Sequence, residues 1–587
     1  MKKIVLLSFF ALCATSGMAQ NYREEFDKFT KNIKETYHEF RNRINKEYAD
    51  FIRQNWPERE VLPALERPLD DKPIPPVFFP EKDLGKEYEG KALPYLDIIP
   101  AAEPSLQPLP IIPIDEMPLT KPIFTINNDN RLEVTPVEID ARPILPKDGT
   151  IINKPVIDTK PGEGLAVKPI DIAVKPNVPK GTTDINKPVV DNKPDKGLAI
   201  KPVDIEVKPR TVEKYFAFKF WNTDGMVRID ESHRFKLKNC SANSIADAWE
   251  LCSGDNYRNL IYDCLMLRET FQLCDWAYLQ MLQELSKAFF GGECNEATFL
   301  TAYIYCQSGY KMRMATNKDG KKLFLLVASQ ELITGKSYFQ FDGEKYYVMD
   351  NSQETRLNVC KAAFEKEQSM SLAMPKAPLF AMEVAGTRNL VSKRFPEIQA
   401  TVSSNKNLLD FYGKYPSTYN AQDDFMRRWA LYANKPMAED MKDELYPALE
   451  KAIEGYPVKD AVNRLLNFVQ TSLAYEYDDK VWGHDRAFFA EESLHYPFCD
   501  CEDRAILFSR IIRDLLELDV VLVYYPGHLA TAVHIPGNEK GDYVMLENKR
   551  FTICDPAFIG ANAGFSQPNV DKTQIKLVLL EKGETEM

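Results

Sequence analysis

The first long pattern of apolar and polar residues along the chain is helical. No proline occurs between residue 20 and Pro57, and aromatic or aliphatic residues recur at seven-residue intervals among charged ones. We therefore expect one amphipathic helix over residues 20–56, packed against the rest of its own protein. A coiled coil with a partner is the alternative, but aromatic residues stand where a zipper has Leu and Ile. The two apolar lines are Phe26, Ile33 and Phe40, and Tyr37, Ile44 and Phe51.

Prolines interrupt the pattern from residue 57 to residue 210. They exclude regular helix over most of this stretch, because each proline lacks a donor and clashes with the preceding turn. INKPVIDTKPGEGLAVKPIDIAVKP (152–176) returns as INKPVVDNKPDKGLAIKPVDIEVKP (185–209), a period of 33 residues (185 − 152). Two copies are fewer than a stacked solenoid needs. We expect residues 57–210 to form a semi-rigid extended spacer; recognition through the Lys-Pro segments is the alternative.

Patterns of helices and strands return after residue 210. They predict an α+β protein with one domain over residues 211–415 and another over residues 416–587. A hairpin is expected around Asn222–Gly225, where a turn sequence separates two alternating runs. The other expected elements are helices within 244–308, strands at 322–329 and 345–350, short strands and turns over 360–405, helices at 423–433, 437–453 and 458–473, and a final helix followed by three strands.

The N-terminus has the features of a secretory signal peptide. Lys2 and Lys3 precede an apolar run, and small residues end at Ala19, where cleavage is expected. We therefore predict a signal peptide over residues 1–19 and an exported protein in the periplasm or at the cell surface. The run is too short to span a bilayer, and no later segment is long and apolar enough.

Composition narrows the class of partner. A net charge of −12 over 587 residues argues against nucleic acid, which requires a basic surface. Export permits disulfides, and four cysteines between residues 240 and 274 are close enough in sequence to pair, but nothing requires them to do so. The sequence does not determine the oligomeric state.

Candidate chemistry is concentrated near residue 500. Cys501 opens a segment with a helical apolar face, and the start of a helix favours a thiolate. Three neighbouring acidic residues oppose the thiolate, so an imidazole is needed to activate it. His528 opens a short apolar strand, and Asp555 lies at the end of another, each 27 residues further on (528 − 501 and 555 − 528). Paired strands would bring both to the helix tip, as nucleophile, base and orienting group.

This region resembles the transglutaminase-like superfamily, whose fold is related to papain. The resemblance lies in Ala490-Glu491-Glu492-Ser493-Leu494, C-E-D-R-A (501–505), P-G-H-L-A-T-A-V (526–533) and R-F-T-I-C-D-P-A (550–557), and covers about residues 458–565. It implies Cys501 as nucleophile, His528 as general base and acid, and Asp555 as the residue that orients the imidazole. The family usually has a small residue where this chain has Cys499. We prefer Cys501 because it alone heads the E-D-R-A helix.

A second, degenerate copy is predicted at about residues 244–352. Gly292 lies two residues before Cys294, as the family pattern prefers, and the strands at 322–328 and 345–350 follow, the second ending in Asp350. Cys294 and Asp350 are 56 residues apart (350 − 294), against 54 for Cys501 and Asp555 (555 − 501). No histidine occupies the position of the base, so this copy is expected to be inert.

The expected function is that of an exported cysteine acyl-transfer enzyme. It would act on amide bonds of peptides, proteins or cell-wall peptides through a thioester, by hydrolysis rather than cross-linking, and needs no metal or organic cofactor. Zinc binding by Cys499, Cys501, Cys554 and the histidines is an alternative, although C-x-C is not a usual ligand spacing. The other alternative is a non-catalytic interaction protein that keeps the fold.

Overall fold

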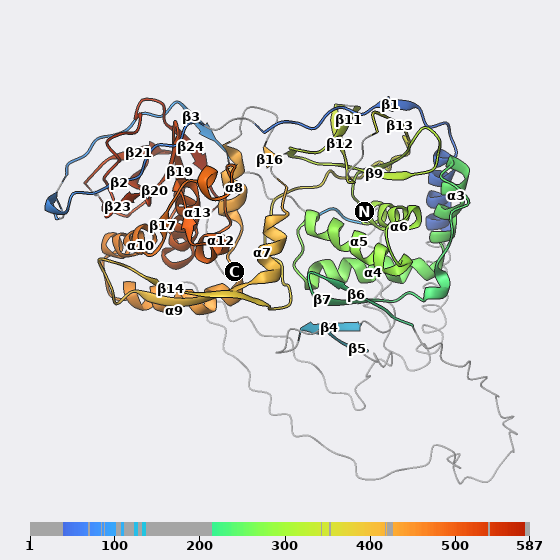
Figure 1. The fold of residues 1–587 in the computed structure, drawn as a ribbon, viewed down its shortest axis with the longest axis horizontal. Helices are drawn as coiled ribbons and strands as arrows, with labels where there is room; N and C mark the ends of the chain where they lie inside the picture. Colours follow the sequence, from blue (N-terminus) through green and yellow to red (C-terminus); the bar gives the residue numbers. More distant parts are fainter. Residues whose placement is uncertain are drawn as a thin grey trace, which may run out of the picture. The chain divides into compact units, whose positions relative to one another are not determined.

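The computed structural model describes residues 39–67, 71–83, 85–86, 88–100, 107–110, 122–126, 132–136, 214–341, 343–350, 354–416, 418–419, 426–537 and 540–581. The predicted signal peptide and the 33-residue repeat lie outside these residues. Helices and mainly antiparallel sheets occur together, so the α+β class is confirmed (Figure 1). Among the described residues, every helix is too short or too polar to span a lipid bilayer.

An unlabelled helix covers residues 39–52. The other helices are α3 (Ala242–Cys252), α4 (Asp255–Thr270), α5 (Asp275–Phe290), α6 (Asn295–Gln307), α7 (Lys406–Gly413), α8 (Arg427–Asn434), α9 (Glu439–Ile453), α10 (Val458–Ser472), α11 (Asp478–Val481), α12 (Ala490–His495) and α13 (Cys501–Leu516), with 3-10 turns η1 (Glu81–Asp83) and η2 (Glu231–His233). The strands are β1 (Glu58–Glu60), β2 (Val77–Phe78), β3 (Asp97–Ile99), β4 (Pro122–Ile126), β5 (Leu132–Pro136), β6 (Phe216–Phe220), β7 (Thr223–Val227), β8 (Met312–Thr316), β9 (Leu323–Ala328), β10 (Leu332–Ile333), β11 (Tyr338–Phe341), β12 (Glu344–Val348), β13 (Arg356–Val359), β14 (Val384–Val391), β15 (Gln399–Asn405), β16 (Thr418–Tyr419), β17 (Ala474–Tyr475), β18 (Phe498–Cys499), β19 (Val520–Tyr525), β20 (His528–Val533), β21 (Tyr543–Leu546), β22 (Lys549–Cys554), β23 (Phe558–Ile559) and β24 (Lys576–Leu579).

Two six-stranded sheets share one strand order. The sheet of the first module (residues 242–359) has the order β1-β13-β8-β9-β12-β11, and that of the second module (residues 458–579) has, in the corresponding direction, β3-β24-β19-β20-β22-β21. Four of the five pairings between neighbouring strands have the same orientation in both sheets. The pairing at one edge differs, because β1 is antiparallel to β13 whereas β3 is parallel to β24. In each module a helix, α6 or α13, leads into the central hairpin and packs on its second strand. The two modules therefore have the same core topology.

The central strands are buried on both faces. Every residue of β8, β9, β19 and β20 is buried, which explains their almost continuous apolar sequences, such as LFLLVA in β9 and VVLVYY in β19. The polar residues in these strands, among them His528 and Thr531, are thus placed in the interior, where they need partners.

The N-terminal helix packs on the first module, as expected, but through a different face. Tyr48 stacks on Phe364 at 4.2 Å between ring centroids, and Ile52 is fully buried. Phe40 and Phe51, from the predicted apolar lines, are 40% and 57% exposed. The seven-residue spacing selected Phe40 and Phe51, whereas the buried face of the helix is the one on which Tyr48 contacts the rings of Trp249 and Phe364.

Residues 57–100 differ from the expected spacer. β1 pairs with β13 of the first module, and β2 and β3 pair with β23 and β24 of the second. Proline excludes helix but allows short edge strands, and these strands are two or three residues long. The start of the proline-rich region is therefore part of both modules.

The predicted hairpin is present one residue earlier than its turn sequence suggested. β6 and β7 are joined through Trp221 and Asn222, which have φ values of 45° and 56°. Two positive φ angles give the turn that suits a two-residue hairpin, and Gly225 lies inside β7.

Candidate active site

Cys501 is the first residue of α13, as the sequence predicted. Asp500 caps the helix, and its own N–H donates to the Asp503 carboxylate at 3.2 Å in a reciprocal capping box. Asp503 also accepts the N–H of Phe488 at 2.8 Å, which fixes the helix start against the preceding loop. The Cys501 side chain is consequently held at a helix tip, although it is only 5% exposed.

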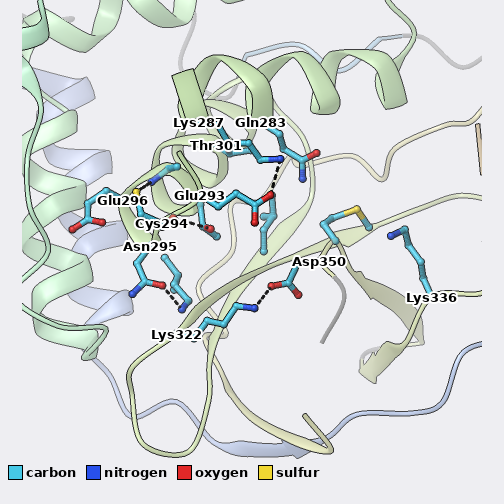
Figure 2. Close-up of a pocket in the computed structure, with 15 residues that line it drawn as sticks. Gln283, Lys287, Glu293, Cys294, Asn295, Glu296, Thr301, Lys322, Lys336 and Asp350 are labelled. Atoms are coloured by element: carbon cyan, nitrogen blue, oxygen red, sulfur yellow. Dashed lines mark hydrogen bonds and ion pairs between the residues drawn. The ribbon is translucent and has the colours of Figure 1, made fainter. Parts of the chain in front are cut away.

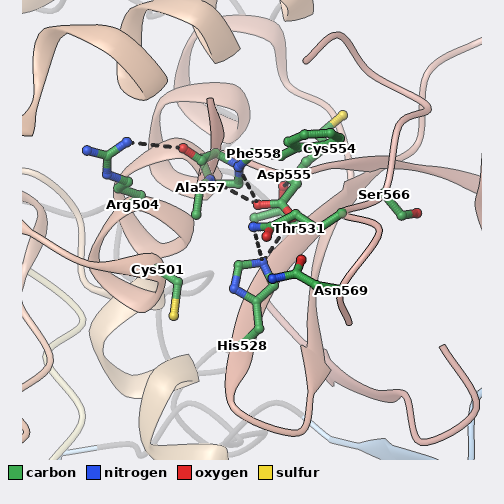
Figure 3. A network of polar contacts seen from close by, with 12 residues as sticks. Cys501, Arg504, His528, Thr531, Cys554, Asp555, Ala557, Phe558, Ser566 and Asn569 are labelled. Carbon is green, nitrogen blue, oxygen red and sulfur yellow. Dashed lines mark hydrogen bonds and ion pairs between the residues drawn. The ribbon is translucent and has the colours of Figure 1, made fainter. Parts of the chain in front are cut away.

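His528 and Asp555 meet through the pairing of β20 and β22. His528 opens β20, and Asp555 directly follows β22, so the strand pair brings the two side chains together. The His528 Nε2 lies 2.9 Å from the Asp555 Oδ2. The other carboxylate oxygen accepts the N–H groups of Ala557 and Phe558 at 2.9 and 3.1 Å, which fixes its orientation (Figure 3).

The remaining nitrogen of His528 is available to Cys501. Nδ1 is buried and has no hydrogen-bond partner in the described part of the chain. In Figure 3 the side of the ring that bears this nitrogen is the side on which Cys501 lies. The N–H of Leu529, the next residue after His528, donates to the Cys501 sulfur and lowers its pKa, although other influences outweigh it. The three predicted residues are thus brought into one site.

A glutamine that the sequence did not single out holds the loop that contains Asp555. Gln470 of α10 is 1% exposed, and its Nε2 donates to the carbonyls of Asp555, Phe558 and Ala561 at 3.0, 2.9 and 3.0 Å. Its Oε1 accepts the N–H of Gly560 at 3.1 Å. A lone glutamine on an apolar helix gives no sequence signal for this role, because its partners lie about ninety residues away.

A second glutamine, Gln567, was also missed. Its amide nitrogen lies 3.2 Å from His528 Nε2, the same nitrogen that faces Asp555. Arg504 links α13 to the C-terminal end of α10 by donating to the carbonyls of Gln470 and Leu473 at 3.0 and 2.8 Å. The site is therefore supported from α10, α13 and the segment after β23.

Burial and nearby carboxyl groups disfavour the thiolate in the resting structure. Burial, followed by Asp500 and Glu502, raises the pKa of Cys501 well above its ordinary value. Burial also raises the pKa of Asp500 and Asp503 well above the usual range, and that of Asp478 to about 6. Protonated carboxyl groups repel a thiolate less than carboxylates do, so they raise the pKa of Cys501 less than ionised groups would.

The zinc interpretation receives no support from the geometry. Within the described ranges, the clusters of side chains that could hold a metal ion join Cys501 to Asp500 and Glu502, or are purely carboxylic, and none includes Cys499 or Cys554. The Cys499 thiol donates to the Ala474 carbonyl, and burial raises its pKa to about 11. All ten described cysteines are free thiols.

The first module has no triad at the corresponding positions. Leu323 opens β9 and pairs with the last residue of β8, as His528 opens β20 and pairs with the last residue of β19. Met349 follows β12 as Asp555 follows β22, and Asn295 opens α6 as Cys501 opens α13. The predicted equivalents, Cys294 and Asp350, each lie one residue away from these positions.

The chain matches no protein-family model, none of the curated proteins and no solved structure.

Proposed function

We propose that this protein is an exported cysteine acyl-transfer enzyme with a transglutaminase-like, papain-related second module. Cys501 is the nucleophile, His528 the general base and acid, and Asp555 the orienting group. The observation that carries the proposal is the 2.9 Å contact between His528 Nε2 and Asp555 Oδ2, which leaves Nδ1 unoccupied beside the helix tip that bears Cys501.

The chemistry follows from this arrangement. Nδ1 of His528 takes the proton of Cys501, and the thiolate attacks an amide carbonyl of a peptide or protein. Backbone N–H groups at the start of α13 stabilise the oxyanion, and the imidazolium returns the proton to the leaving amine. Water, activated by the same imidazole, then hydrolyses the thioester. We propose hydrolysis rather than transfer to an amine, because an exported enzyme meets amines in dilute solution and the sequence indicates no site for one.

Access to the sulfur requires movement. Cys501 packs in one apolar cluster with Trp429 of α8, Ala487 and Tyr524, and Trp429 stacks on Tyr524 at 5.6 Å. A substrate carbonyl can reach the sulfur only after part of this cover opens. We therefore place a conformational step before acylation.

A non-catalytic interaction protein is the second candidate, and one observation favours it. The raised pKa of Cys501, caused by burial and by Asp500 and Glu502, describes a thiol that stays neutral at rest. If His528 cannot take its proton, the second module would be a folded scaffold, as the first is proposed to be. The shared strand order of the two modules also supports an origin by duplication, with the triad kept in one copy.

Site-resolved alkylation distinguishes the two candidates. The mature protein is treated with iodoacetamide at pH 7, and the labelling rate of each cysteine is measured by mass spectrometry. In an enzyme the labelling of Cys501 depends on the imidazole, so His528→Ala should slow Cys501 at least about tenfold, while the exposed Cys294 serves as the internal reference and should keep its rate. His534→Ala, beyond the far end of the same strand, is the matched control and should leave the rate unchanged. A Cys501 that is slower than Cys294 and insensitive to His528→Ala would refute the enzymatic proposal.

A further inference from the structure

The first module contains a cavity of about 780 Å³ at the place where the second module has its triad (Figure 2). Asn295 at the start of α6, Leu323 at the start of β9 and Met349 after β12 all line it. These are the register positions of Cys501, His528 and Asp555 in the second module. The first module therefore has neither nucleophile, base nor orienting carboxylate at these three positions, but has an open cavity among the same three elements. A cavity of this size suits a small ligand or the end of a peptide.

Most charges that line the cavity are already compensated. Lys287 pairs with Glu293 at 3.1 Å, and Lys322 pairs with Asp350 at 2.9 Å. Glu296 accepts the N–H of Leu237 at 2.9 Å. These contacts leave the lining with few charged groups that could bind a ligand strongly.

Lys336 is the exception. It follows the turn at Gly335, lines the cavity, and makes no hydrogen bond or ion pair with the described residues; Figure 2 shows its ammonium without a contact. Its surroundings are partly buried, and this desolvation lowers its pKa, with Asp350 as the opposing influence. A partly desolvated ammonium gains more from an anionic ligand than an exposed one does, because water competes less.

The cavity also offers an acceptor. Asp350 Oδ1 is buried and has no hydrogen-bond partner among the described residues, while the other carboxylate oxygen pairs with Lys322. A ligand that satisfies both groups carries one negative charge and at least one N–H donor. A polyanion is disfavoured because Glu293, Glu296 and Asp350 line the same cavity.

We propose that this cavity binds the C-terminal end of a peptide, with the free carboxylate on Lys336 and a peptide N–H on Asp350. No bond is made or broken, because no imidazole faces Cys294 in this module. The binding site does not depend on the chemistry of the second module. It would remain if Cys501 proved inert, and its loss would leave the catalytic proposal intact.

Cys294 provides a reporter for this site. It lines the cavity and is the one exposed cysteine among the ten described. A bound peptide should slow its alkylation. The probe is a library of tripeptides with free C-termini, at millimolar concentration, and the comparison is the same library with amidated C-termini. The full mature protein is used, and alkylation of Cys294 by a maleimide is followed by mass spectrometry.

The free-acid library should protect Cys294 at least about tenfold more than the amidated library. Lys336→Gln should abolish this difference, and Lys318→Gln, an exposed lysine outside the cavity, should preserve it. Thermal unfolding of both variants checks the fold, and Lys336→Gln is expected to unfold no earlier than the parent because it removes a desolvated charge. Equal protection by the two libraries, no protection by either, or protection that survives Lys336→Gln would overturn the proposal.

Discussion

Close to Cys501 the chain buries several carboxylic acids in contact with one another. Asp478, Asp500 and Asp503 are buried within 4.8 Å of one another, counted between ligand atoms. Ionised carboxylates in such a group repel each other and lose hydration, which is why burial and mutual repulsion raise their pKa values. The protein thus retains an unfavourable cluster at its candidate active site, as functional sites often do.

Asp478→Asn should stabilise the protein at high pH. The pKa of Asp478 is raised to about 6 in the folded state, mainly by burial, against about 3.9 in an unfolded chain. The stability of the parent is therefore fully present below pH 4 and decreases as the pH rises through 6. The amide avoids this loss, so the variant should be more stable at pH 8, by at most about 3 kcal/mol, and unchanged at pH 4.

Denaturant unfolding at pH 4, 6 and 8 measures the effect. Asp479→Asn, at the exposed neighbouring position, should show no such pH dependence. Equal destabilisation of Asp478→Asn at pH 4, 6 and 8 would contradict this prediction and would show that the hydrogen bond from the backbone N–H of Arg486, at 2.6 Å, matters more than the charge of the carboxyl group.

Among the elements, α10 determines the shape of the loop after β22. One side chain of this helix, Gln470, lies within hydrogen-bond distance of four backbone groups between residues 555 and 561, with the two hydrogens of its Nε2 shared among three carbonyls. A loop that carries a candidate orienting carboxylate must be rigid, because small displacements weaken the contact with the imidazole. Part of the rigidity therefore comes from a neighbouring helix, in addition to the short pairing of β23 with β2 and the backbone hydrogen bonds within the loop.

Gln470→Ala should destabilise the protein by about 1–3 kcal/mol, because the Ala561 carbonyl and the Gly560 N–H lose the partner that Gln470 provides, whereas the carbonyls of Asp555 and Phe558 keep the N–H groups of Phe558 and Ala561. Hydrogen exchange should also accelerate at Ala557 and Phe558. Gln399→Ala, at an exposed position on β15, is the control and should change stability by no more than about 0.5 kcal/mol. Unchanged stability and exchange in Gln470→Ala would show that the loop keeps its own conformation.

At the scale of the whole molecule, residues 72–79 near the N-terminus pack on the second module, although most of the chain separates the two in sequence. Ile74 donates its N–H to Gly527 at 2.8 Å, next to His528, and Val77 pairs with Phe558. Gly527 has a φ of 77°, and an added Cβ there would lie 2.2 Å from the Lys72 carbonyl, so only glycine permits this approach. The segment therefore lies against both strand ends that carry the candidate base and its orienting group.

Phe79→Ala should loosen this segment. Phe79 packs edge-on against Phe558 and Phe565 at 5.5 and 4.8 Å, whereas its neighbour Phe78 is 69% exposed. Limited proteolysis should cleave within residues 71–86 markedly faster in Phe79→Ala, and alkylation of Cys501 should accelerate if the segment also restricts the site. Phe78→Ala is the matched control and should behave like the parent. Identical cleavage of all three proteins would show that Phe79 does not anchor the segment.

Local patterns in the sequence determined several parts of the site. The apolar face after Cys501 predicted α13, the short apolar runs predicted β20 and β22, and the ends of these strands identified His528 and Asp555. These predictions succeeded because helix and strand periodicity and turn chemistry act over a few residues. The sequence also indicated that the two modules are alike, and they share one strand order, but the residues predicted as equivalent are displaced by one, because sequence spacing does not fix strand register.

Tertiary structure alone decided what surrounds these residues. The burial of Cys501, the group of buried carboxyl groups, the contacts of Gln470 and the pairing of β2 with β23 join segments that are tens to hundreds of residues apart. No local pattern records such contacts, because their free energy depends on which distant groups the fold brings together. The sequence thus assigned Cys501, His528 and Asp555 to a helix and two strands. Tertiary packing determined the pKa values of the groups around them, the rigidity of the site and the access of a substrate to it.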